Sequence, residues 1–278
     1  MLVELTLLIL SVSWSPTQRA WGWLCERTGD FGMTVGGSFG ALVLGYLAGS
    51  VPYLVLDGWR PRFAHTAKVQ PERYVSVRDV WRCFVSLMGL FFLVMLPLIA
   101  SSYPVFRWVG IQRRPPLPTP DVLALHLITC LVVEDFGNYW IHRWLHTPWM
   151  YRQVHYWHHQ WTAPFGLAAT DAHPVEVVAL GIPTIAGPVL LSSHLFTTLV
   201  WLMIRQYEAI DIHSGYEFRW NLNHWIPFYA GTEHHDFHHY LYSGNFASIF
   251  TYCDEIYGTN TAFKQRKRQL PADADKPA

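Results

Sequence analysis

The sequence predicts an all-α integral membrane protein, and three observations support that prediction. Hydrophobic residues make up 51% of the 278 residues and charged residues only 14%, whereas a soluble domain carries about 25% charged residues. Three stretches are apolar over roughly the 20 residues that a spanning helix needs. Histidines gather in two short windows that follow these stretches. We therefore expect about three transmembrane helices plus a helical hairpin, with a histidine-rich helical cap on the cytosolic side.

The N-terminal segment 1–33 is expected to lie at the membrane interface. Its apolar run Leu7–Leu10 is too short to span, and no basic region with a small-residue cleavage site marks a signal peptide. The next region, 34–120, is predicted to hold transmembrane helices and their loops. The spanning stretches are Thr34–Leu56, Phe84–Ser102 and, just beyond this region, Asp121–Trp140.

The third predicted span opens the region 121–262, which also contains both histidine windows. Glu134 and Asp135 lie within this span, and acidic side chains at that depth are costly unless they face protein or water. A further apolar stretch, Val177–Ile204, is interrupted by glycines, prolines and a serine pair. It predicts a hairpin of two shorter helices that enters and returns on one side. The last residues, 263–278, form a basic and polar tail.

The basic residues of the loops predict the orientation. Loop Asp57–Cys83 carries six Arg or Lys residues, whereas loop Tyr103–Pro120 carries three. The positive-inside tendency then places the first loop in the cytosol, and three crossings put both histidine windows on that same side.

Charge and cysteine usage exclude several classes of protein. Lys+Arg and Asp+Glu balance at 20 each, so no basic face argues for nucleic acid. The four cysteines form no C-x-x-C pair, which argues against a disulfide framework and a thiolate zinc site. No G-x-G-x-x-G follows a predicted strand, so a bound dinucleotide is not expected.

The histidines form three boxes. Twelve of the 15 histidines lie in windows 142–173 and 213–239. The boxes read H-x-x-x-H, H-x-x-H-H and H-x-x-H-H. Because residues three and four apart share a helix face, each box is expected to aim two or three imidazoles at one point. Eight boxed histidines are too many for one ion, so two metals are predicted. The isolated histidines are expected to be surface or packed residues: His65, His126, His194 and His224.

The donor type favours iron. Imidazole suits Fe, Zn, Cu and Ni, and the lack of thiolates argues against structural zinc. Arg143 and Trp144 occupy the first box where a metalloprotease has H-E-x-x-H. A pair of all-histidine metals beside a membrane, without haem or flavin motifs, favours two iron ions that activate O2, because side chains alone cannot oxidise an unactivated C–H bond.

The order of the boxes resembles the signature of the fatty acid hydroxylase/sterol desaturase superfamily. Within it, several phrases resemble the C-4 methylsterol oxidases, over roughly residues 30–262. The phrases are Glu134-Asp135, His142-Arg143, Ala163–Gly166, Ala172–Pro174, His213–Tyr216, Ile226–Gly231 running into His234–His239, Gly244–Ser248 and Ile256–Thr259.

This resemblance implies an endoplasmic-reticulum enzyme with a fatty acid hydroxylase catalytic domain at 121–262. Such an enzyme oxidises the sterol C-4 methyl group through alcohol and aldehyde to the carboxylate. It uses O2 and NAD(P)H electrons that arrive through cytochrome b5 reductase and cytochrome b5, and other sterol C-4 demethylation enzymes take the product. Basic side chains at 60–82 and 264–268 are expected to attract the acidic cytochrome or anionic membrane lipid.

Other interpretations of the sequence remain open. Histidine boxes do not separate C-4 oxidation from fatty acyl hydroxylation or sterol C-5 desaturation, and a non-catalytic metal-binding membrane scaffold is an alternative of another class. The sequence leaves open the preference between 4,4-dimethyl and 4α-monomethyl sterols, the sterol side chain and the oligomeric state.

The resemblance also implies the site residues, and it assigns no catalytic residue beyond the metal ligands. The ligands are His142, His146, His155, His158, His159, His213, His235, His238 and His239. Further candidates, as ligands or as hydrogen-bond partners of ligands, are His173, Glu217, Glu134, Asp135, Asp236, Glu208 and Asp211. His234 is not expected to be a ligand. A sterol should enter from the bilayer through an apolar pocket whose expected walls are Trp161, Phe165, Gly166, Phe228 and Tyr229.

Overall fold

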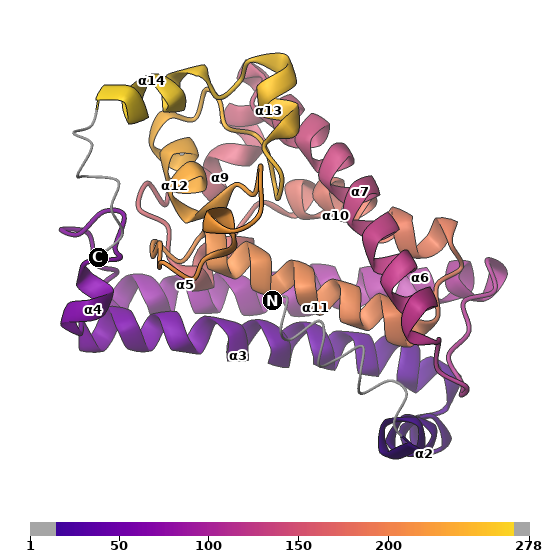
Figure 1. Ribbon diagram of the computed structural model, residues 1–278. Helices are drawn as coiled ribbons and strands as arrows, with labels where there is room; N and C mark the ends of the chain where they lie inside the picture. The colour runs from indigo at the N-terminus through magenta and orange to yellow at the C-terminus, as the bar shows by residue number, and fades with distance from the viewer. Residues whose placement is uncertain (1–14, 270–278) are drawn as a thin grey trace. The chain divides into compact units, whose positions relative to one another are not determined.

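The computed structural model describes residues 15–269, and helices dominate them (Figure 1). Within that range there is no strand, only two isolated β-bridges. The all-α prediction is confirmed. The apolar run Leu7–Leu10 lies outside the described residues, so its interfacial placement stays a prediction.

The first apolar region is one long helical run. It consists of α2 (Ser15–Phe31), a π-helical turn η1 (Gly32–Gly37) and α3 (Ser38–Trp59). Gly29 interrupts the run with φ 66° and ψ 177°, a backbone conformation that glycine adopts because it lacks a Cβ. The resulting kink separates most of α2 from the predicted span, which begins at Thr34.

The second and third apolar regions extend beyond their predicted limits. The second comprises α5 (Val77–Leu90), η2 (Phe91–Met95) and α6 (Leu96–Trp108), and the third is α7 (Pro120–Leu145). All three regions are long and apolar enough to cross a membrane. Leu93 is 79% exposed and Leu125 62%, as expected of apolar side chains that face lipid. The prediction of three helices that are long and apolar enough to span a membrane is confirmed for residues 15–269.

The predicted hairpin is also present. Its helices are α10 (Pro174–Leu190) and α11 (Leu195–Ile212). The break falls at Ser192, which has φ 46°, whereas α10 runs through Pro183 and Pro188 without ending. Two helices therefore form, and the turn at the serine pair divides them.

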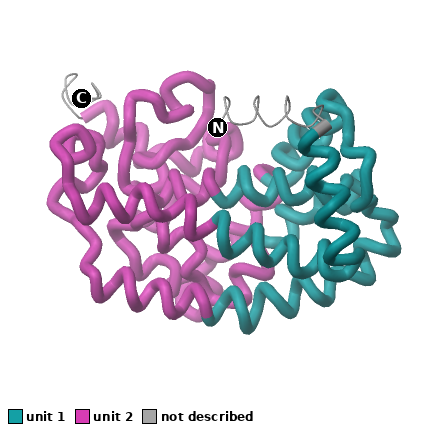
Figure 2. The backbone as a smooth tube through the Cα atoms, turned by 90° about the horizontal axis from the view of Figure 1, so that it is seen from below, with its two compact units in different colours: residues 1–45, 89–134, 181–206 teal, residues 46–88, 135–180, 207–278 magenta. Residues whose placement is uncertain are grey.

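The chain divides into two compact units, coloured in Figure 2. Unit 1 comprises residues 1–45, 89–134 and 181–206, and unit 2 comprises residues 46–88, 135–180 and 207–278. Because the units interleave along the chain, they do not follow the predicted boundaries at 34, 121 and 263, and those domain limits stay a prediction.

Unit 1 packs apolar helices closely. Its core includes Trp21, Leu127 and Trp201. A Cβ built on Gly187 of α10 would lie 2.7 Å from the Cα of Cys130 in α7. This glycine allows the two helix backbones to approach, as small residues do between membrane helices.

Unit 2 contains both histidine windows and most of the short elements. They are α4 (Arg62–His65), α8 (Pro148–Met150), the π-helix η3 (Tyr151–His155), α9 (Tyr156–His159), the 3-10 helices η4 (Gly166–Thr170) and η5 (Leu222–His224), α12 (Gly231–Leu241), α13 (Tyr252–Tyr257) and α14 (Thr261–Gln269).

Candidate metal centre

Four parts of unit 2 supply the boxed histidines and His213. The first box lies at the end of α7, where the His146 amide donates to the His142 carbonyl at 3.2 Å and continues the helical pattern by one residue. The second box runs from η3 into α9, and the third lies on α12. His213 directly follows α11. The short helices bring residues that are about 100 positions apart in sequence to one place.

These parts gather nine histidines into two groups that could each hold a metal ion. Within a group, the candidate ligand atoms all lie within 4.8 Å of one another. The first group is His142, His146, His155, His159 and His238, and the second is His158, His213, His235 and His239. These are the nine residues that the sequence nominated, and their role as ligands stays a prediction.

The second and third boxes each serve both groups. In the second box, His155 and His159 belong to the first group and His158 to the second. In the third box, His235 and His239 belong to the second group, while His238 belongs to the first. Two imidazoles of each box therefore point to one group, as expected, and the third imidazole of these two boxes points to the other group.

The angle between successive side chains on a helix explains why the histidines of one box point to two groups. At about 100° per residue, side chains four apart on a helix diverge by about 40°, whereas those three apart diverge by about 60° in the opposite sense. The i and i+4 histidines of an H-x-x-H-H box therefore share one group, and the i+3 histidine turns to the other.

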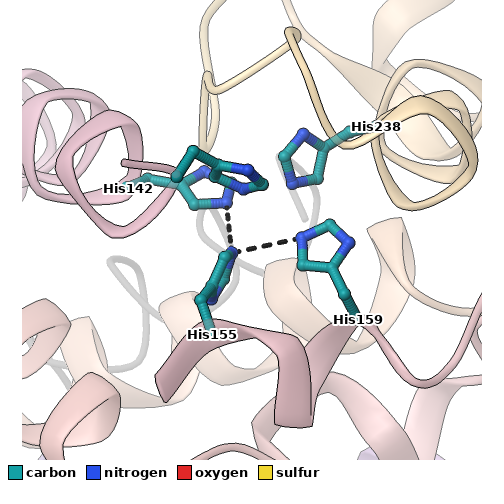
Figure 3. Close-up of side chains that lie close together, drawn as sticks. His142, His155, His159 and His238 are labelled. Atoms are coloured by element: carbon teal, nitrogen blue, oxygen red, sulfur yellow. Dashed lines mark hydrogen bonds between the residues drawn. The ribbon is translucent and has the colours of Figure 1, made fainter. Parts of the chain in front are cut away.

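Ring nitrogens meet closely in the first group. Figure 3 shows the rings of His142, His155, His159 and His238 turned towards one another. The Nε2 of His155 lies 3.2 Å from the Nε2 of His142 and 3.1 Å from that of His159. In the second group, the Nε2 of His213 lies 3.1 Å from that of His158 and 2.9 Å from that of His235.

Backbone carbonyls determine which nitrogen carries the proton. The Nδ1–H of His142 donates to the Phe246 carbonyl at 2.9 Å, and that of His238 donates to the Gly244 carbonyl at 2.6 Å. The Nδ1–H of His213 likewise donates to the Ala209 carbonyl in α11 at 2.7 Å. A neutral imidazole that donates from Nδ1 has only a lone pair on Nε2. Lone pairs that face each other at about 3 Å repel unless a cation lies between them.

Burial keeps the rings neutral and so able to donate lone pairs to a metal. It lowers the pKa of His158 to about 4. Burial and neighbouring imidazoles lower the pKa values of His155, His159, His238 and His239 well below the usual range. At neutral pH these rings are therefore unprotonated, as metal ligands must be.

The spacing of the nitrogens suits ligands that share a metal ion. Imidazole nitrogens about 2.1 Å from one metal lie about 3.0–3.4 Å apart. The observed Nε2 separations of 2.9–3.2 Å are close to that range. A donor set made only of imidazoles suits iron better than structural zinc.

Most of the acidic candidates have other partners. Glu134 pairs with Arg205 at 2.8 Å within unit 1. Asp135 accepts the backbone N–H groups of Ile249 and Phe250 at 2.9 and 3.0 Å, and it thereby holds the loop that follows the third box. None of the acidic candidates belongs to either histidine group of the described residues.

Two further acidic candidates hold neighbouring segments, and a third is buried. Asp236 accepts from Gln70 Nε2 at 2.9 Å, and burial raises its pKa to about 6. Asp211 accepts from the Tyr53 hydroxyl at 2.6 Å. Glu208 is buried, 3% exposed. As hydrogen-bond partners of ligands these residues remain candidates only.

His173 and Glu217 lie outside both groups. His173 Nδ1 accepts the Val175 backbone N–H at 3.2 Å at the start of α10, which is the role of a helix cap. Glu217 accepts the Glu233 backbone N–H at 2.9 Å. The histidines expected to be non-ligands, His65, His126, His194, His224 and His234, also lie outside both groups.

The expected pocket walls are mostly packed against protein. Trp161 donates from Nε1 to Asp171 at 2.9 Å and meets Phe165 edge-on. A Cβ on Gly166 would lie 3.1 Å from Ile210, so neighbouring side chains already pack against this glycine. Tyr229 is buried.

The fifth expected wall, Phe228, lies near the start of α12 and differs from the others in its exposure. Phe228 is 59% exposed. Gly231 has φ 73°, and a Cβ there would lie 2.7 Å from Asn223, so this glycine provides a turn into α12. The contribution of all these residues to a substrate pocket stays a prediction.

Sequence reasoning missed Glu176. Its Oε2 lies 2.8 Å from His155 Nδ1, and the two side chains are only 3% and 1% exposed. Glu176 is the single charged residue of the apolar helix α10. An isolated acid in an apolar helix was the signal that could have identified it.

Comparisons with known proteins agree with this site. The profile of the family described as "Fatty acid hydroxylase" matches residues 127–259. The chain is 45% identical over 220 residues to very-long-chain aldehyde decarbonylase GL1-10 of Oryza sativa subsp. japonica, covering 78% of this chain and 73% of the relative.

Methylsterol monooxygenases of Arabidopsis thaliana are also similar. Methylsterol monooxygenase 1-1 is 44% identical over 206 residues, 73% of this chain and 69% of the relative. Methylsterol monooxygenase 2-2 is 36% identical over 253 residues, 90% of this chain and 94% of the relative. No solved structure matches the chain significantly.

Proposed function

The chain belongs to the fatty acid hydroxylase family, and we propose that it is a membrane-bound di-iron monooxygenase that oxidises the C-4 methyl group of 4-methyl- or 4,4-dimethylsterols. The observation that carries the proposal is the pair of histidine groups whose Nε2 atoms converge at 2.9–3.2 Å. The methylsterol monooxygenases that resemble the chain support the sterol substrate.

The chain's own residues would hold the metals and set their electronic character. Nine neutral imidazoles supply the ligands, and the carbonyls of Phe246 and Gly244 keep two of the rings in the tautomer that binds through Nε2. When bound, two iron ions supply the one-electron steps that activate O2 for attack on a C–H bond. Burial of the ligands excludes bulk water from a strong oxidant.

The reaction would proceed in rounds on the same carbon. In each round one O2, two electrons and two protons are consumed, one oxygen atom enters the substrate and the other leaves as water. The first round converts the methyl group to an alcohol. The second converts the alcohol to a hydrated aldehyde, which loses water to give the aldehyde, and the third converts the aldehyde to the carboxylate. Other sterol C-4 demethylation enzymes would then take the product.

The electrons are proposed to come from NAD(P)H through cytochrome b5 reductase and cytochrome b5. The C-terminal helix α14 carries Arg266, Lys267 and Arg268 in its last turn, a cationic feature that suits an acidic partner. If the helix steers the cytochrome, turnover at limiting cytochrome should fall with rising salt. Charge reversal at these positions should remove that dependence, and turnover that is insensitive to both changes would exclude this docking site.

We further propose that the protein lies in the endoplasmic-reticulum membrane with its histidine groups facing the cytosol. The three apolar helical regions support membrane insertion, and the excess of basic residues in loop Asp57–Cys83 supports the orientation. The sterol is proposed to enter laterally from lipid, because moving it into water costs about 25 cal/mol for each Å² of apolar surface.

A product assay tests the proposed function. Purified, iron-loaded protein would be supplied with NADH, cytochrome b5 reductase, cytochrome b5 and either a 4,4-dimethylsterol or a 4α-methylsterol. Mass spectrometry should detect the hydroxymethyl, aldehyde and carboxylate sterols in sequence. Iron content should approach two per chain, and the His239→Ala variant should form no product. Iron-loaded protein that leaves both sterols unchanged would exclude the assignment.

A second candidate is conversion of a very-long-chain aldehyde, which the 45% identity to the rice aldehyde decarbonylase favours. The same preparation separates the two functions, because the substrates differ in shape and in the bond that breaks. Loss of the aldehyde carbon from a long-chain aldehyde, without sterol oxidation, would favour this second candidate. Hydroxylation of a fatty acyl chain or desaturation at sterol C-5 would appear in the same product analysis.

A further inference from the structure

The grouped histidines differ in what their Nδ1 atoms contact. In the first group, His142 and His238 donate to neutral backbone carbonyls at 2.9 and 2.6 Å. His155 instead faces a carboxylate, because its Nδ1 lies 2.8 Å from Glu176 Oε2. His155 is also central to the first group, since its Nε2 lies within 3.2 Å of the Nε2 atoms of both His142 and His159.

Burial alone raises the pKa of the Glu176 carboxyl well above its usual range, so its charged form beside the ring depends on positive charge nearby. The residue lies in the first turn of α10, a helix of 17 residues, where the positive end of the helix dipole stabilises an anion. The carboxylate is buried, so little solvent screens its interaction with His155. An N–H donated to a carboxylate makes an imidazole a stronger lone-pair donor than one donated to a carbonyl.

The charge of the metal ions would also favour a carboxylate beside the first group. Two divalent ions held by nine neutral imidazoles would place a large positive charge in a buried site, which is costly without compensation. Glu176 contributes a negative charge next to the first group. That group also has five imidazoles, whereas the second group has four.

We propose that Glu176 is a positioning residue for the first metal: it holds the His155 ring with Nε2 directed into the first group and strengthens that imidazole as a donor. The two metal positions are then unequal, and the first binds its ion more tightly. This inference rests on the metal-binding role in the proposed function.

Cobalt binding tests the proposal without any turnover. Apoprotein in detergent micelles is titrated with Co²⁺, whose visible absorption reports ligand number and strength. The wild type should bind two ions in two separable steps. Glu176→Gln keeps the shape and removes the charge, so it should weaken the tighter step about 10–100-fold and shift its absorption band, while the weaker step is unchanged. Glu176→Asp should recover part of the lost affinity.

Glu217→Gln is the matched control, since Glu217 is a largely buried glutamate of the same unit that lies outside both groups. It should retain both steps. Apoprotein melting temperatures show whether each variant is folded. Wild-type affinities and spectrum in Glu176→Gln would overturn the proposal, and so would an equal loss of both steps that Glu176→Asp does not relieve. Failure of the wild type itself to bind two ions would instead refute the metal centre, and this proposal with it.

Discussion

A buried ion pair in unit 2 should contribute strongly to stability. Lys68 Nζ lies 2.9 Å from Asp57 Oδ1, and the two side chains are 4% and 3% exposed. The Tyr216 hydroxyl donates to the same Asp57 oxygen at 2.8 Å, and the Lys68 ammonium lies 4.2 Å from the centre of the Tyr216 ring. The Lys68→Met substitution would therefore leave the Asp57 carboxylate in the protein interior with a hydroxyl but no cation.

The expected cost is large because water does not reach the remaining charge. Removing one partner of a buried pair destabilises a protein by about 3–5 kcal/mol, whereas replacing both partners with neutral groups costs much less. For a chain of this size, the Lys68→Met variant should melt about 10 °C lower than the wild type. The double variant Lys68→Met with Asp57→Asn should recover most of that difference, because asparagine can still accept the Tyr216 hydroxyl.

The pair also joins the loop of Lys68 to the segment that follows His213. Val69 N–H donates to the Gly215 carbonyl at 3.0 Å, and Glu217 N–H donates to the Ala67 carbonyl at 2.7 Å. Lys68→Met should therefore also weaken the second metal position more than the first.

Thermal unfolding of apoprotein in micelles and Co²⁺ titration measure the two effects. The reasoning fails if the single variant melts like the wild type, or if the double variant is at least as unstable as the single one.

Three other predictions follow from the same contacts. The His239→Ala variant should lose the second metal and all oxidation activity. The His194→Ala variant should keep both, because His194 lies in unit 1 outside both groups. Metal analysis and turnover assays of the two variants test this difference. Burial lowers the pKa of His158 from 6.5 to about 4, so the unfolded chain binds a proton at higher pH than the folded chain does. The apoprotein should then lose about 3 kcal/mol through this ring as pH falls from 6.5 to 4, and none above 6.5; a melting temperature constant across that window would contradict this. Gly187→Leu should destabilise the protein by about 3 kcal/mol or more, because its side chain meets the Cys130 backbone; an unchanged melting temperature would exclude that close packing.

The sequence by itself determined the fold class and the main helical regions. Apolar stretches of sufficient length can satisfy their backbone hydrogen bonds in lipid only as helices, so composition and length were enough to identify three spanning regions and the hairpin. The helix limits were less accurate. The second region runs from Val77 to Trp108, because a helix continues into polar residues until something in the chain ends it.

The sequence also nominated the nine histidines, because the number and spacing of the eight in three boxes have no other simple cause and the family resemblance added His213. It did not determine how they divide. In the second and third boxes, positions i and i+4 turn to one group and position i+3 turns to the other. Which histidines then share a group depends on how α9 and α12 pack, and the stacked rings of His159 and His239 show that these two helices face each other.

Only the tertiary structure decided which groups surround the ligands. The carbonyl that fixes His142 comes from Phe246, 104 residues away, and the carboxylate beside His155 comes from Glu176 on another helix. The acids nominated from sequence, such as Glu134 and Asp135, were chosen because they are costly in a membrane, but other partners in the fold bind them. A sequence pattern records which residues share one helix face, whereas the partner of a ring nitrogen depends on distances between segments that only packing sets.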